Sequence, residues 1–190
     1  METIPLIYMK KRKIFIDNTK SSLPLKEFLK NFETEKKIYI LDIDGIEKDK
    51  PNLCTYQRLS NKYDLWVDFG PRNIGDIVDA TMAGATNITL RKHLSPQLNI
   101  QDIRDLSENK IYYNIDFDEE LSYYEVDGLV NFNKKEEIES DFKHSDLFKR
   151  SILKKKTYCY DSEPKNWPYW KRYGIENFLI DIDRIKEVQK

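Results

Sequence analysis

The chain has 190 residues, which is long enough for one domain with a buried core. It carries 32 Lys and Arg residues against 33 Asp and Glu residues, a formal net charge of -1, so no overall positive field attracts nucleic acid or an anionic membrane. No stretch approaches the roughly 20 apolar residues of a membrane helix, and the N-terminus lacks the pattern of a signal peptide. We therefore expect one cytoplasmic domain over residues 1–190 that binds neither nucleic acid nor membrane.

Short runs of β-branched and aromatic residues alternate along the chain with polar segments of helical spacing. In chain order, the predicted strands cover residues 5–16, 37–44, 64–69, 87–90, 110–117, 128–132, 157–160 and 177–182. The predicted helices between them cover residues 25–32, 52–61, 74–83, 100–107, 136–150, 166–173 and 184–188. The segment 119–125, after the fifth strand, is too short for a full helix.

Alternation of strands and helices favours a parallel sheet covered on both faces. Eight such units predict a closed barrel, although barrels of this kind usually have about 250 residues. We therefore expect an α/β fold: a compact eight-stranded TIM (β/α) barrel with short or missing helices. The alternative is an open doubly wound sheet, which usually has about five or six strands.

Three segments resemble a known family of barrels. They are residues 38–45 (Ile-Tyr-Ile-Leu-Asp-Ile-Asp-Gly), 65–72 (Leu-Trp-Val-Asp-Phe-Gly-Pro-Arg) and 84–90 (Gly-Ala-Thr-Asn-Ile-Thr-Leu). In this order they resemble strands two to four of the phosphoribosylformimino-aminoimidazole carboxamide ribotide isomerases of histidine biosynthesis, and unassigned archaeal relatives of those enzymes. Elsewhere the likeness is one of pattern alone.

The resemblance implies isomerase- or lyase-like proton transfer on a phosphorylated, sugar-like or small carbonyl substrate. The family's first strand ends in a catalytic aspartate, where this chain has Tyr8. The family's second catalytic aspartate, near the end of strand five, matches Asp116. A tyrosine with its ordinary pKa of about 10 is a poor replacement for a carboxylate. We therefore expect a reaction other than the one in histidine biosynthesis.

Phosphate binding in the family uses glycine-rich turns after the third and fourth strands. Here Gly70 and Arg72 follow the third strand, and Arg91 and Lys92 stand where the family has Gly-Thr. Guanidinium groups bind phosphate oxygens bidentately, so these four residues are predicted to hold a single phosphate. The ends of strands seven and eight would repel a second phosphate, because carboxylates replace the family's glycines there: Asp161, Glu163, Asp181 and Asp183.

Aspartates follow most of the predicted strands, so a barrel would gather them at one mouth. Converging carboxylates form an acid/base centre or bind a hard cation, whereas single aspartates more often cap the following helix. We predict Asp116 as the acid/base, with Asp44 and Asp68 assisting, and we assign no metal or cofactor.

Two further features leave alternatives open. The aromatic segment 167–173 either packs into the core, which we favour, or contacts a partner such as a second copy of the chain. Cys54 and Cys159 are interpreted as reduced packing residues. A noncatalytic barrel that binds a metabolite or a protein is the alternative function, and it is favoured if Tyr8, Phe69 and Phe117 fill the pocket.

Overall fold

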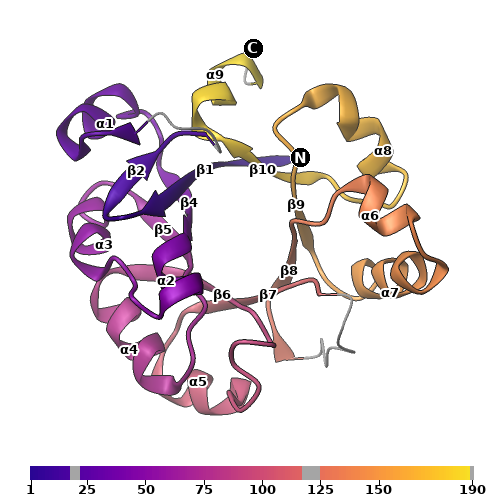
Figure 1. The fold of residues 1–190 in the computed structure, drawn as a ribbon, viewed down its shortest axis with the longest axis horizontal. Coiled ribbons are helices and arrows are strands. Elements are labelled where there is room, and N and C mark those ends of the chain that lie inside the picture. The colour runs from indigo at the N-terminus through magenta and orange to yellow at the C-terminus, as the bar shows by residue number, and fades with distance from the viewer. Residues whose placement is uncertain (18–21, 117–124, 189–190) are drawn as a thin grey trace.

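The computed structural model describes residues 1–17, 22–116 and 125–188. Eight parallel strands form a closed barrel, seen end-on in Figure 1. They are β1 (Glu2–Lys10), β4 (Lys37–Asp42), β5 (Asp64–Asp68), β6 (Ala85–Leu90), β7 (Lys110–Asn114), β8 (Gly128–Asn131), β9 (Thr157–Tyr160) and β10 (Asn177–Asp181). The barrel closes where β10 pairs with β1, from Glu2 beside Asn177 to Leu6 beside Asp181.

Helices lie between the strands and surround the barrel in Figure 1. They are α1 (Leu25–Asn31), α2 (Ile43–Lys48), α3 (Leu53–Leu59), α4 (Ile74–Met82), α5 (Ile100–Leu106), α6 (Lys135–Glu139), α7 (Phe142–Ile152), α8 (Trp167–Lys171) and α9 (Ile185–Val188), with 3-10 turns η2 (Pro164–Asn166) and η3 (Ile182–Arg184). The predicted α/β barrel is confirmed, and the open doubly wound sheet is wrong. No helix in the described ranges is long and apolar enough to cross a membrane.

Three predicted boundaries are wrong for local reasons. The second predicted strand ends at Asp42, because that side chain accepts a hydrogen bond from the backbone N–H of Gly45 and caps α2. The predicted helix 136–150 is two helices, since Asp141 caps α7. The first predicted strand, 5–16, is a hairpin of β1 and β2 (Lys13–Phe15), extended by β3 (Ser22–Leu23). The predicted short segment 119–125 falls almost entirely outside the described residues.

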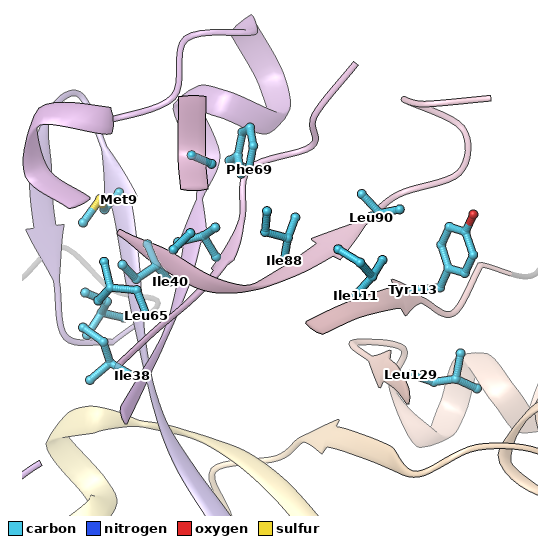
Figure 2. Close-up of a cluster of buried hydrophobic side chains, with 14 of the residues drawn as sticks. Met9, Ile38, Ile40, Leu65, Phe69, Ile88, Leu90, Ile111, Tyr113 and Leu129 are labelled. Carbon is cyan, nitrogen blue, oxygen red and sulfur yellow. The ribbon is translucent and has the colours of Figure 1, made fainter. Parts of the chain in front are cut away.

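Side chains alternate between the two faces of each barrel strand. One set points outward and packs under the helices, as Figure 2 shows for Ile40, Leu65, Ile88 and other members. The outward set also takes in Trp167, which stacks on Phe178 with ring centroids 4.4 Å apart. The prediction that the aromatic segment 167–173 contributes to the core is therefore confirmed for Trp167 and for the buried Trp170.

The inward set fills the barrel with aromatic rings. The indole of Trp66 lies 4.0 Å from the ring of Tyr112, 4.8 Å from Tyr158 and 5.0 Å from Tyr39, measured between centroids. All four side chains are buried. The centre of the barrel is therefore a second packed core, and in a barrel of this kind ligands bind where the strands end.

Candidate active site at the mouth of the barrel

Two adjoining cavities lie where the barrel strands end. One, of about 450 Å³, is bounded by β1, the strand β2, β4, α2 and the ends of β8 and β9. The other, of about 540 Å³, is bounded by the ends of β8, β9 and β10 and by α6, η2 and α8. Phe132, Lys134 and Tyr160 line both cavities. Together they form a groove over the carboxyl ends of parallel strands, where α/β proteins place their ligands.

Three polar side chains meet on the floor of this groove, at the seam that closes the barrel. The hydroxyl of Tyr8 lies 2.9 Å from the hydroxyl of Tyr160 and donates to Oδ1 of Asp181, also at 2.9 Å. The hydroxyl of Tyr160 lies 3.0 Å from Oδ2 of Asp181. β1, β9 and β10 each supply one of these inward-facing residues near the carboxyl end of the strand. The strand pairings therefore bring together residues that lie far apart in the sequence.

The environment of this cluster shifts the acidity of all three groups. Burial raises the pKa of Asp181, hydrogen bonds from Tyr8 and Tyr160 act against this rise, and the charge of Asp17 adds to it. Burial and Asp181 raise the pKa of Tyr160 to about 12, and that of Tyr8 further. The tyrosines are thus protonated donors at neutral pH, and Asp181 is a stronger base than an ordinary aspartate.

The structure brings together two residues that were predicted for different roles. Asp68 is buried inside the barrel, and Arg91 donates to it bidentately, from Nε at 2.9 Å and from Nη2 at 2.7 Å. The hydroxyl of Tyr39 donates to the same carboxylate at 3.0 Å. Although burial alone lowers the pKa of Arg91, its pairing with Asp68 raises that pKa overall. Much of the hydrogen-bonding capacity of both side chains is therefore used within the protein.

The other predicted phosphate ligands are Gly70, Arg72 and Lys92, and the first two contact each other in the loop after β5. Nη1 of Arg72 donates to the carbonyl of Gly70, and Nη2 donates to the carbonyl of Ile46 at 2.7 Å. The guanidinium of Arg72 thus holds the loop after β5 against α2. Gly70 has φ of 63°, a left-handed conformation that favours glycine, and Lys92 is partly buried. None of these three residues lines either cavity of the groove, and the predicted phosphate site stays a prediction.

Asp44 and Asp116, the remaining predicted catalytic residues, lie in separate surroundings. Asp44 accepts hydrogen bonds from the N–H of Arg12 at 3.3 Å and from Nζ of Lys48 at 3.1 Å. Asp116 is paired with Nδ1 of His93 at 3.2 Å, and its side chain is 24% exposed. Neither aspartate lines either cavity of the groove.

No family model matches the chain, and no curated protein matches its sequence. The resemblance to ribotide isomerases therefore stays a prediction, and the functional assignment depends on the geometry of the mouth. Within the described ranges, no three His, Cys, Asp or Glu side chains are grouped so that they could hold a metal ion.

Sequence reasoning noted Tyr8 and Asp181 separately and did not join them. The signal that joins them is alternation: Tyr8 follows the inward-facing Ile4 and Leu6 at a period of two, and Asp181 follows the inward-facing Leu179. Phe69, which was expected to help fill a blocked pocket, packs in the outward cluster instead. Phe117, named with it, lies outside the described residues.

Proposed function

We propose that this protein is a barrel enzyme of the TIM type that moves a proton on a small, sugar-like carbonyl compound. The hydrogen-bonded cluster of Tyr8, Tyr160 and Asp181 carries this proposal, because it joins a carboxylate of raised pKa to two neutral hydroxyls beside the groove. β/α barrel enzymes place their chemistry at this end of the strands. Tyr8 also stands where the ribotide isomerases have a catalytic aspartate. The same position at the end of the first strand would therefore contact the substrate, with a hydroxyl in place of a carboxylate.

The roles follow from which group can gain a proton and which can donate one. Asp181 takes the proton from the carbon next to the substrate carbonyl, which gives an enediol, and returns it to the former carbonyl carbon. The hydroxyl proton of the first carbon passes to the former carbonyl oxygen, so that an aldose and a ketose interconvert. The hydroxyls of Tyr8 and Tyr160 each have one proton, which they share with Asp181 or with each other in the free protein. When substrate is bound they turn toward the carbonyl oxygen and donate to it while negative charge develops there. Hydrogen-bond donors aimed at an oxygen that gains negative charge stabilise the transition state.

The walls of the groove fit a compact polar substrate. The rings of Phe132 and Tyr160 stack at 5.5 Å with an interplanar angle of 30°, and both residues line the two cavities, so they supply aromatic surface to a bound compound. Lys134, Asp161 and Asn166 line the groove around this surface and provide hydrogen-bond donors and acceptors. We include phosphorylated compounds of this class among the proposed substrates. Lys134, which lines both cavities, would bind the phosphate group.

Exchange of substrate hydrogens with solvent deuterium tests the proposal directly. Aldoses, ketoses and their phosphates are incubated with the protein in D₂O, and loss of the proton signal next to the carbonyl is followed by NMR. We expect exchange with at least one compound, and a loss of about 100-fold or more in Asp181→Asn, since general acid–base groups contribute about 10²–10⁴-fold.

Asp183→Asn is the matched control. It removes an exposed carboxylate two residues away that lines neither cavity of the groove. This variant should keep most of the exchange. Absence of exchange with every compound, or equal exchange in the native protein and in Asp181→Asn, contradicts the proposal.

A noncatalytic metabolite-binding barrel is the second candidate. It is favoured by the Asp68–Arg91 pair and by the Lys48–Asp44 pair, because two of the predicted catalytic carboxylates already have cationic partners. Compounds that raise the melting temperature without any exchange would support this second function, since a ligand that binds only the folded state stabilises it.

A further inference from the structure

A third cavity, of about 770 Å³, lies between the tip of the β1–β2 hairpin and the segment that joins α2 to α3. It shares no lining residue with the two cavities of the groove. Four cationic side chains line it, Lys11, Arg12, Lys48 and Lys50, against one carboxylate, that of Asp44. A chain with a net charge of -1 thus concentrates positive charge in one hollow.

The hairpin tip has a backbone that its residues do not favour. Lys11 has φ of 52° and Arg12 has φ of 60°, so both lie in the left-handed region. Two-residue hairpin turns with this conformation are usually Asn-Gly or Asp-Gly, because other residues are strained there. Nothing in the turn itself requires two long cations. Backbone strain at Lys11 and Arg12 therefore indicates that their side chains have a role outside the turn.

Asp44 holds the parts of the hollow together. Its Oδ2 accepts from the N–H of Arg12 at 3.3 Å and from Nδ2 of Asn52 at 3.4 Å, and its Oδ1 accepts from Nζ of Lys48 at 3.1 Å. These hydrogen bonds lower the pKa of Asp44 although burial acts to raise it, so it stays ionised. One carboxylate therefore fixes the hairpin tip against α2, and the hollow keeps an excess of positive charge.

We propose that this hollow binds a small, soluble ligand with two or more phosphate groups. An arginine at the rim binds phosphate oxygens bidentately, and lysines add point charges around it. The apolar side chains of Pro51 and Leu53 and the methylene stems of the lysines line the same space, and they suit an organic part of the ligand. The site would make Asp44 a positioning residue of an anion site rather than part of the acid/base centre.

Calorimetric titration with inorganic phosphate, pyrophosphate and tripolyphosphate tests the site. We expect the affinity to rise along this series and to fall about tenfold or more for pyrophosphate in the double variant Arg12→Gln/Lys50→Gln. The control is Lys26→Gln/Lys30→Gln, which removes the same charge from exposed positions of α1. The control variant should bind pyrophosphate like the native protein.

Two outcomes overturn the proposal: no binding of tripolyphosphate by the native protein, or an equal loss of affinity in both double variants, which would show attraction by overall charge alone. Circular dichroism confirms that each variant is folded before titration. The deuterium exchange described above should be unchanged in Arg12→Gln/Lys50→Gln, because neither residue lines the groove. Failure of this site would therefore leave the proposed function standing.

Discussion

Replacing Asp68 by asparagine should destabilise the protein strongly, because it leaves the Arg91 guanidinium inside the barrel without its hydrogen-bonded counter-charge and with only the weaker attraction of Asp116. The two side chains are 0% and 16% exposed. Breaking a buried ion pair by removing one partner costs about 3–5 kcal/mol, a large part of the roughly 5–15 kcal/mol that stabilises a typical domain. Arg91→Met should cost a similar amount, since it leaves the buried carboxylate of Asp68 without the guanidinium and with the hydroxyl of Tyr39 as its remaining hydrogen-bond donor among the contacts described above.

Urea unfolding, followed by circular dichroism at fixed pH and salt, measures these losses. The double variant Asp68→Asn/Arg91→Met removes both charges, so its loss should fall short of the sum of the single losses by about 2 kcal/mol. Arg150→Gln breaks an exposed pair with Asp146 and should cost less than about 1 kcal/mol. Single losses as small as that of this control, or losses that add up in the double variant, would refute the reasoning.

Three further predictions concern single sites. Gly45→Ala should lower the free energy of unfolding by about 1–3 kcal/mol, because an added Cβ would lie 2.6 Å from the carbonyl oxygen of Phe69; an unchanged urea midpoint would contradict this. The exposed Cys54 should react with a thiol reagent in the native protein, whereas Cys159, which is buried and has a raised pKa, should react only after unfolding; two fast-reacting thiols would be the contrary result. Because the folded pKa of Asp181 is raised above 3.8, the folded state binds this proton more tightly than the unfolded chain, and its contribution to stability is lost as the pH rises through the folded pKa. The stability of the native protein relative to Asp181→Asn should therefore fall as the pH rises above 3.8 in urea titrations, and a pH-independent difference would exclude the assignment.

Most strands could be predicted because each is a short apolar run bounded by polar residues. The strand 157–160 was predicted with the bounds that the structure has. The errors arose where a side chain redirects the backbone. Asp42 stops an apolar run that continues through Ile43, and the turn at Lys11 and Arg12 lacks the asparagine and glycine that mark such turns.

The site could be predicted only in part, because carboxylates at strand ends face either the barrel or the helices. Asp42 faces the helices, where it accepts a short hydrogen bond of 2.5 Å from the hydroxyl of Tyr56. Asp68 and Asp181 face the barrel. A shift of one residue in register reverses this choice, and alternation along a strand does not by itself say which of its two faces is the inner one. The meeting of Tyr8 with Asp181 depends also on which strands close the barrel.

The pairing of β10 with β1 has a consequence for synthesis of the protein. The chain emerges from the ribosome N-terminus first. The edge of β1 that pairs with β10 therefore stays unpaired until residues 177–181 have been made. The cluster at the mouth does not exist before that moment, because Asp181 is the last residue of the last strand. Loss of this final strand would therefore remove the closure of the barrel and the proposed base together.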